Sequence, residues 1–270
     1  MKVGRCSCVA ASLLLATAAV AEQAPAANDA AALALKLSNP VAALISVPLQ
    51  FNYDADIGPA RDGERFTLNI QPVVPFKLSA DWNLVSRTIL PVISQGSIYP
   101  GAGSQTGLGD TVQSVFLTPA KAGGMIWGAG AVVLVPTATD KLLGGGKWGA
   151  GPTGVVLKQM GPWTVGGLAN HLWSFAGDSG RNDISATFIN PFFTHTSKSA
   201  FTYGVAADIT YDWHSDTVTM PVTVSASQLT KVSGQLVTFG VGLRYYVATT
   251  EFSPHGLAGR VSATLLFPVK

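Results

Sequence analysis

Apolar and polar residues alternate one by one in several segments of this chain. Between residues 45 and 53 the odd-numbered positions are all apolar, whereas the even-numbered positions include Ser46, Gln50 and Asn52. The same period of two returns in three further segments, at 66–71, 201–211 and 237–247. Because successive side chains of a β-strand point to opposite faces, each segment predicts a strand with one apolar and one polar face.

Twelve strands can be placed along the chain, separated by alternating short turns and longer polar loops. Their expected ranges are 44–53, 65–76, 82–92, 110–118, 126–136, 148–157, 163–174, 184–195, 201–212, 217–226, 236–247 and 257–267. A helix is expected at 28–37, which is rich in Ala and Leu and is stopped by Asn39-Pro40. An even number of strands, each of about ten residues, is typical of a membrane barrel with both chain ends on one side. We therefore predict an all-β fold, a transmembrane antiparallel β-barrel of about 12 strands, with a short N-terminal helix that could cap or enter the barrel.

The N-terminus carries the features of an export signal. Lys2 and Arg5 precede an apolar, Ala-rich run from Val9 to Val20, and Ala19-Val20-Ala21 offers the small residues that a signal peptidase requires. This run is too short to remain as a membrane span. The expected divisions are a signal peptide at 1–21, an N-terminal segment with the short helix at 22–40, and an outer-membrane β-barrel at 41–270.

Composition narrows the possible functions. Both cysteines, Cys6 and Cys8, lie within the predicted signal, so we expect no disulfide and no cysteine metal site in the mature chain. Without Lys2 and Arg5, the 17 basic residues fall to 15 and equal the 15 acidic ones. A neutral chain gives no support to nucleic-acid binding, which needs a concentrated basic face. We also expect no cofactor and no metal.

Charge and tryptophan placement distinguish the two ends of the predicted barrel. The turns on the side of the termini carry basic residues, namely Lys77, Lys121, Lys158, Lys198 and Lys231, with Asp81 as the only acidic residue. The opposite loops and rims hold Asp54, Asp56, Asp62, Glu64, Asp110, Asp140, Asp178, Asp183, Asp212, Asp216 and Glu251. The tryptophans fall at strand ends, with Trp82, Trp127 and Trp163 on the basic side and Trp148, Trp173 and Trp213 on the acidic side. Two aromatic girdles favour a membrane barrel over a soluble β-sandwich or soluble barrel.

A set of short motifs in a fixed order resembles one family. The motifs are Leu37-Ser38-Asn39-Pro40-Val41-Ala42-Ala43-Leu44-Ile45-Ser46-Val47-Pro48, Ser86-Arg87-Thr88-Ile89-Leu90-Pro91-Val92, Gly107-Leu108-Gly109-Asp110, Asn170-His171-Leu172-Trp173-Ser174, Tyr211-Asp212-Trp213, Arg244-Tyr245-Tyr246 and Leu265-Leu266-Phe267-Pro268. With these motifs, nearly the whole mature chain resembles the bacterial outer-membrane transporter-like family labelled "meta-pathway of phenol degradation". The resemblance implies an outer-membrane barrel linked to uptake of aromatic or other hydrophobic compounds. It supplies no catalytic residues.

Four charged residues are expected to point into the lumen. Arg87, Asp208, Arg244 and Arg260 lie between neighbours that belong to the outward apolar set. Arg244 and Arg260 fall on adjacent strands and at a height similar to that of Asp208. One interpretation is a ligand-binding constriction for a carboxylate, phosphate or phenolate, because arginine offers planar paired donors. The other is that these groups pair with one another or with water and brace a polar lumen.

Prolines form a second unusual feature of the predicted strands. They are Pro48, Pro72, Pro91, Pro136, Pro152, Pro191 and Pro221. A proline has no backbone donor and therefore interrupts the ladder. These positions are consistent either with a side gap through which an apolar substrate leaves the lumen or with bulges that curve the wall.

The sequence predicts an outer-membrane channel or transporter for passive uptake of small hydrophobic or aromatic molecules, and not an enzyme. The alternatives are a general diffusion pore for polar solutes, an outer-membrane hydrolase and a structural barrel. Asp212, His214 and Asp216 could poise a water for hydrolysis or hold a cation, but their spacing is not an established catalytic motif. The expected partners are outer-membrane lipids and a small-molecule solute, without nucleic acid, and a monomer is favoured over a weak oligomer.

Overall fold

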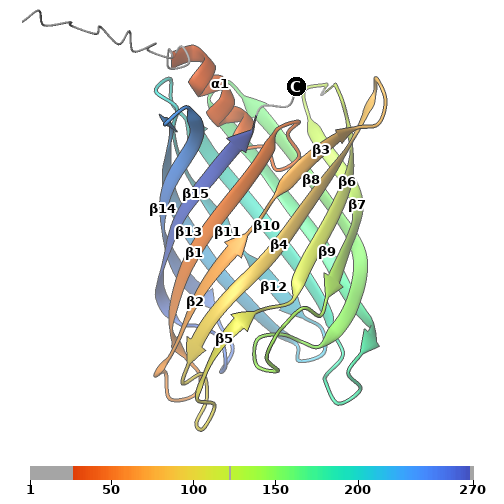
Figure 1. Ribbon diagram of the computed structural model, residues 1–270, viewed down its shortest axis with the longest axis vertical. Helices are drawn as coiled ribbons and strands as arrows, with labels where there is room; N and C mark the ends of the chain where they lie inside the picture. The colour runs from red at the N-terminus through yellow and green to blue at the C-terminus, as the bar shows by residue number, and fades with distance from the viewer. Residues whose placement is uncertain (1–26, 122, 268–270) are drawn as a thin grey trace, which may run out of the picture.

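The fold is a closed antiparallel β-barrel of 12 strands with one short helix at the end that carries the termini (Figure 1). The structure is a computed structural model that describes residues 27–121 and 123–267; the predicted signal peptide and residues 268–270 lie outside this part. The elements are α1 (Ala27–Leu37), β1 (Ile45–Ile57), β2 (Gly63–Ile70), β3 (Val73–Lys77), β4 (Trp82–Gly96), β5 (Ser104–Leu108), β6 (Thr111–Pro119), β7 (Ile126–Val135), β8 (Lys147–Met160), β9 (Trp163–Gly177), β10 (Ser185–Thr196), β11 (Phe201–Ala207), β12 (Ile209–Asp212), β13 (Thr217–Val232), β14 (Gln235–Ala248) and β15 (Gly256–Phe267). Three barrel strands are interrupted, so that β2 with β3, β5 with β6, and β11 with β12 each form one strand.

Continuous pairing between neighbouring strands closes the barrel. The first and last strands, β1 and β15, pair from Ile45 opposite Phe267 to Tyr53 opposite Gly259. On the far side, β9 and β10 pair from Trp163 opposite His195 to Trp173 opposite Ser185. A closed wall satisfies the backbone groups between strands, as a lipid environment requires. The predicted fold class and strand number are therefore confirmed, and α1 lies within one residue of the expected helix.

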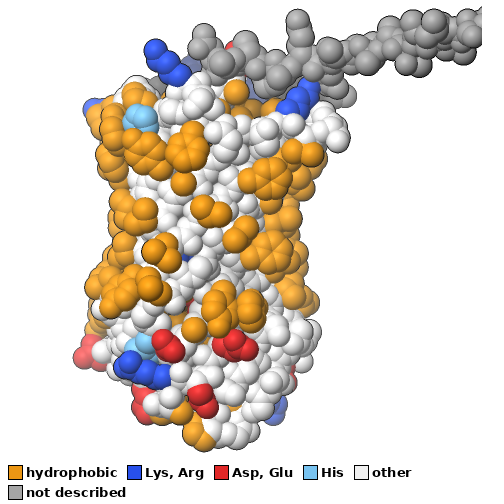
Figure 2. All heavy atoms as spheres, turned by 90° about the vertical axis from the view of Figure 1, so that its left-hand side faces the viewer, with side chains coloured by type: hydrophobic (Ala, Val, Ile, Leu, Met, Phe, Trp, Pro, Cys, Tyr) orange, Lys and Arg blue, Asp and Glu red, His pale blue; other side chains and the backbone are white. Residues whose placement is uncertain are grey.

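Side-chain exposure follows the predicted alternation. On β1, Phe51 is 52% exposed on the outside, whereas the next residue, Asn52, is 5% exposed and points inward. On β14 and β15, Val241 and Val261 are likewise exposed on the outer surface. In Figure 2 hydrophobic side chains are spread over the wall of the barrel, and most of the acidic side chains visible there gather at the end opposite α1. The outer face is thus apolar, and the polar residues line the lumen.

The six tryptophans all lie exposed on the outer surface. Near the termini, Trp82 and Trp127 pack edge to face with ring centroids 6.0 Å apart. At the other end, the ring centroids of Trp173 and His171 are 4.0 Å apart. Such clusters are typical of the interfacial girdles of membrane barrels. Among the helical residues that the structure describes, no segment is both long and apolar enough to cross a membrane.

Three of the seven prolines, Pro48, Pro91 and Pro221, lie opposite interruptions of a neighbouring strand that hydrogen bonds bridge. The carbonyl of Pro48 accepts a hydrogen bond from the backbone N–H of Gln71, and the carbonyl of Pro91 accepts one from the backbone N–H of Gly109, each at 2.9 Å. The carbonyl of Pro221 accepts at 2.9 Å from the amide of Asp208, which separates β11 from β12. These three prolines therefore place their carbonyls opposite breaks in the neighbouring strand. Because these breaks stay bridged, the geometry at the three positions favours curvature of the wall over a side gap.

Several strand bounds differ from the sequence prediction, including the end of β13, which lies at Val232 rather than 226. The first strand runs beyond residue 53 to Ile57, so Asp54 is a buried lumen residue, 6% exposed, and its assignment to the outer rim was wrong. Asp54 lies two residues after Asn52 and therefore on the same face, and β1 continues because β2 pairs with it at Asp54 opposite Arg65 and Ile57 opposite Gly63. The fourth strand begins at Ser104 rather than 110, because β5 pairs with the extended end of β4.

Candidate functional site: the barrel lumen

The four sequence-predicted lumen residues line one cavity. We call it the central chamber; its volume is about 540 Å³, and it contains Arg87, Asp208, Arg244 and Arg260 in its lining. The residues come from β4, the β11–β12 junction, β14 and β15, so the alternation placed all four on the correct face. A cavity of this size is within the range of small-molecule sites.

Arg244 holds a buried ion pair that the sequence did not reveal. Its Nη1 lies 3.1 Å from Asp54 Oδ1, and the two side chains are each 9% exposed. The Tyr246 hydroxyl donates to the same oxygen at 2.8 Å. Arg244 and Tyr246 are two residues apart on β14 and face inward together. This arrangement explains two positions of the Arg244-Tyr245-Tyr246 motif, while Tyr245 is 55% exposed on the outside.

Asp208 connects two of the arginines. Its Oδ2 lies 3.8 Å from Arg244 Nη2 and 3.6 Å from Arg260 Nη2. Its other oxygen accepts from the Asn190 side chain at 2.8 Å, and Arg260 Nε donates to Asn52 Oδ1 at 2.7 Å. These contacts bring three of the predicted residues into one network. For Asp208, Arg244 and Arg260 the pairing interpretation is therefore the one that the geometry supports.

Arg87 stands apart from this network. Its Nη2 donates to Gln71 Oε1 at 3.0 Å, and Gln71 Nε2 donates in turn to Gln50 Oε1 at 2.8 Å. Among the described residues no carboxylate oxygen lies within 4.0 Å of the guanidinium. The remaining donors of Arg87 therefore have no anionic partner from the described chain.

The central chamber is lined by two chemically different sets of side chains. The charged and amide side chains come mainly from β1, β2, β14 and β15. The apolar side chains of Ile89, Val112, Leu168, Leu172 and Phe188 come from β4, β6, β9 and β10, which also contribute Arg87, Ser114, Asn170 and Asn190. Beyond them, Val85, Phe116, Val155 and Leu157 form a buried cluster inside the barrel. The chamber thus presents both charged and apolar side chains to a solute, with most of the apolar ones on β4, β6, β9 and β10.

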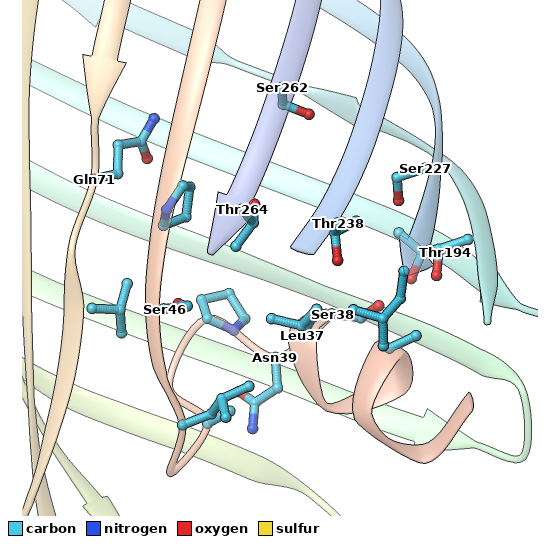
Figure 3. Close-up of a pocket in the computed structure, with 18 of the residues that line it drawn as sticks. Leu37, Ser38, Asn39, Ser46, Gln71, Thr194, Ser227, Thr238, Ser262 and Thr264 are labelled. Carbon is cyan, nitrogen blue, oxygen red and sulfur yellow. The ribbon is translucent and has the colours of Figure 1, made fainter. Parts of the chain in front are cut away.

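A second cavity lies between the central chamber and the end of the barrel that carries the termini. We call it the terminal chamber; its volume is about 380 Å³. Figure 3 shows residues of the barrel wall around it, namely Ser46, Gln71, Thr194, Ser227, Thr238, Ser262 and Thr264, with Leu37, Ser38 and Asn39 at the helix end. Gln50, Gln71 and Arg87 line both chambers. The two cavities are therefore contiguous, and Arg87 lies where they meet.

The helix α1 and the residues after it form part of the wall of the terminal chamber. Ala34 is 4% exposed and packs in a cluster with Ala200, Leu229 and Leu266. The carbonyl of Leu35 accepts a hydrogen bond from the Gln159 side chain at 2.8 Å. These contacts hold α1 against the inside of several strands and narrow this end of the lumen.

The opposite end is narrowed by the loop between β7 and β8. The Asp110 carboxylate accepts from the backbone amides of Gly145 at 2.6 Å and Ala138 at 3.2 Å. Gln95, which faces the lumen, donates to the Leu142 carbonyl at 3.0 Å. A Cβ on Gly107 would lie 2.0 Å from Thr139 Oγ1 of this loop, so the close approach requires glycine. The Gly107-Leu108-Gly109-Asp110 motif therefore ties the loop to the β5–β6 strand.

An ion pair joins β8 to the neighbouring β9–β10 loop. Lys147 Nζ lies 2.9 Å from Asp183 Oδ1. This hydrogen bond, together with the positive charge of Lys147, lowers the pKa of the exposed Asp183 carboxyl below its usual value.

The two acidic loop residues considered for catalysis, Asp212 and Asp216, accept hydrogen bonds from neighbouring residues. Asp212 Oδ1 accepts from the backbone amides of His214 at 2.8 Å and Ser215 at 3.2 Å. Asp216 accepts from the Tyr211 hydroxyl. These are contacts of a polar turn. They do not assemble a nucleophile, base and orienting group.

Comparison with known proteins gives structural relatives only. No family profile matches the sequence, and no curated protein matches it. An outer-membrane channel from Pseudomonas putida F1 superposes with a TM-score of 0.67 at 14% identity, covering 83% of this chain and 96% of that one. The KdgM porin in complex with disordered oligogalacturonate gives a TM-score of 0.45 at 9% identity, covering 83% of this chain and 99% of that one. The outer-membrane phospholipase dimer of Salmonella typhi with bound calcium gives a TM-score of 0.46 at 10% identity, covering 90% of this chain and 98% of that one.

The chain has the fold of bacterial outer-membrane β-barrels. At 14% identity the likeness to the Pseudomonas channel concerns the fold alone. The resemblance to the family labelled "meta-pathway of phenol degradation" stays a prediction.

Proposed function

We propose that this protein is an outer-membrane channel for passive uptake of small hydrophobic or aromatic molecules. The observation that carries the proposal is the pair of contiguous chambers inside the barrel, of about 540 and 380 Å³. The central chamber offers a solute apolar side chains from four strands, β4, β6, β9 and β10. A water-filled pore for polar solutes alone has no need of such side chains, because hydrocarbon surface in contact with water is unfavourable.

Arg87, Asp208, Arg244 and Arg260 are the residues proposed to form the solute site of the lumen, in which Asp208, Arg244 and Arg260 pair with one another and shape the charged part. Asp208, Arg244 and Arg260 give the charged part a fixed shape, because each is held by at least one partner. The fold shared with the Pseudomonas outer-membrane channel agrees with a transport role. Passive movement is proposed because the described residues contain no nucleotide-binding motif that could couple an energy source.

Block of single-channel current by p-cresol tests the proposal. We expect the purified protein in planar bilayers to conduct, and p-cresol to reduce the current saturably by occupying the central chamber. Phe188→Ala removes an aromatic side chain from the chamber wall and should weaken the block about tenfold, as expected from the loss of one buried apolar contact. The matched control is Ile189→Ala, because Ile189 is the next residue on β10 and is 43% exposed on the outer surface.

Ile189→Ala should leave the block within about twofold of the unmodified protein, since no chamber contact is lost. A current that p-cresol does not change would contradict uptake of aromatic molecules and favour a polar diffusion pore. Absence of any current would contradict the channel itself.

A further inference from the structure

We propose that Arg87 binds the carboxylate of an organic acid whose apolar body lies along Ile89 and Val112. The inference rests on the proposed function, because it names the class of solute that the lumen would take. It assigns the anion-binding role to one of the lumen arginines and gives Arg244 and Arg260 a supporting role.

The position of Arg87 makes it a contact for any solute that crosses the lumen. Arg87, Gln50 and Gln71 line the central and the terminal chamber alike. A molecule that moves between the two chambers therefore passes these three side chains. Of the three, only Arg87 carries a charge.

The orientation of the Arg87 side chain is fixed by two amides. Gln71 accepts from Arg87 through Oε1 at 3.0 Å and donates to Gln50 through Nε2 at 2.8 Å. The second hydrogen bond determines which end of the Gln71 amide faces Arg87. A guanidinium has five N–H donors, and the Gln71 contact uses one of them. The donors left over suit the paired oxygens of a carboxylate.

The other two arginines of the central chamber already have acidic partners. Arg244 pairs with Asp54 at 3.1 Å, and both Arg244 and Arg260 lie within 4.0 Å of Asp208. A solute anion at either arginine would compete with a carboxylate that is fixed in place. At Arg87 no carboxylate oxygen of the described chain lies within 4.0 Å, and Asp208 contacts the other two arginines instead. The chamber lining contains three arginines and two aspartates and so has a net positive charge. This charge is available at Arg87.

Hydrocarbon lies next to the Arg87 guanidinium on the same wall. In the pairing of β4 with β6, Arg87 lies opposite Ser114, and Ile89 lies opposite Val112. Ile89 and Val112 are thus the next inward-facing pair on the side of the central chamber, and both line it. A rigid apolar group attached to a carboxylate would contact these two side chains while the carboxylate meets Arg87. The volume of about 540 Å³ accommodates such a molecule.

Equilibrium dialysis of the detergent-solubilised protein tests the inference with three probes. We use 2-naphthoate, 2-naphthalenemethanol, which lacks the charge, and acetate, which lacks the apolar body. The unmodified protein should bind 2-naphthoate at least tenfold more tightly than either other probe. Arg87→Gln should weaken 2-naphthoate binding at least tenfold and leave 2-naphthalenemethanol unchanged, which also shows that the chamber remains intact. Arg87→Lys should bind 2-naphthoate with an affinity between those of the unmodified protein and Arg87→Gln.

The matched control is Arg65→Gln. Arg65 also faces the lumen and also donates to a glutamine, Gln95 Oε1 at 2.8 Å, but it lines neither chamber. This variant should change 2-naphthoate binding less than twofold. Equal binding of 2-naphthoate to the unmodified protein and Arg87→Gln would overturn the inference, and so would an equal loss in Arg65→Gln.

Single-channel current in the same preparations separates this inference from the proposed function. Normal current without 2-naphthoate binding would overturn the inference and leave the channel standing. Binding that depends on Arg87 in a protein without current would support the site and contradict the channel.

Discussion

Ala34→Asp is expected to release α1 from the barrel end and to raise single-channel conductance severalfold. Ala34 is 4% exposed and packs against Ala200, Leu229 and Leu266. A carboxylate at this position would lose its hydration without gaining a partner, at a cost of several kcal/mol. A helix of 11 residues has little stability without such packing. Since α1 forms part of the terminal chamber, its release should widen the path.

Ala32→Asp provides the control for this experiment, because Ala32 lies on the exposed side of the same helix. It introduces the same charge and should leave conductance unchanged. If both variants conduct like the unmodified protein while proteolysis shows that α1 has been released in Ala34→Asp, the helix does not restrict the path.

Asp54→Asn is expected to lower the free energy of unfolding by about 3 kcal/mol, the lower part of the range for breaking a buried ion pair. Asp54 and Arg244 are each 9% exposed at their side chains, so Arg244 would lose its nearest counter-charge in a buried site. The loss should stay in the lower part of the range because Asp208 remains 3.8 Å from Arg244. Denaturant unfolding of the protein in lipid vesicles measures the change.

Asp56→Asn is the matched control, because Asp56 is two residues further along β1 and exposed. It should alter the free energy of unfolding by less than about 0.5 kcal/mol, as is usual for a surface position. An equally small effect of Asp54→Asn would mean that the ion pair does not brace the lumen.

The strands and the lumen-facing residues could be predicted from the sequence because both depend on local alternation. Arg87, Asp208, Arg244 and Arg260 alternate with outward-facing apolar neighbours, and this alternation was sufficient to place them inward. The same alternation could also have identified Asp54, which was instead assigned to a loop because the first strand was ended at residue 53. A longer strand in the prediction would have corrected this.

The partners of these residues could not be predicted in the same way. Asp54 and Arg244 are separated by 190 positions in the chain, and their contact depends on the register of β1, β15 and β14 together. Local patterns do not determine such a register. The Asp110 contact with Gly145 and the place of α1 in the terminal chamber likewise depend on the closed barrel. For the same reason, the difference between Arg87 and the other arginines became visible only in three dimensions.

Chemical modification of a single cysteine in the lumen tests the central claim most directly. Both cysteines of the sequence lie at positions 6 and 8, so a refolded chain of residues 22–270 contains none. Ser262 lines the terminal chamber, and its neighbour Val261 is 58% exposed on the outer wall. We predict that a charged methanethiosulfonate reagent lowers the single-channel current of Ser262→Cys and leaves that of Val261→Cys unchanged. A current in Ser262→Cys that does not change after confirmed modification would contradict conduction through the lumen.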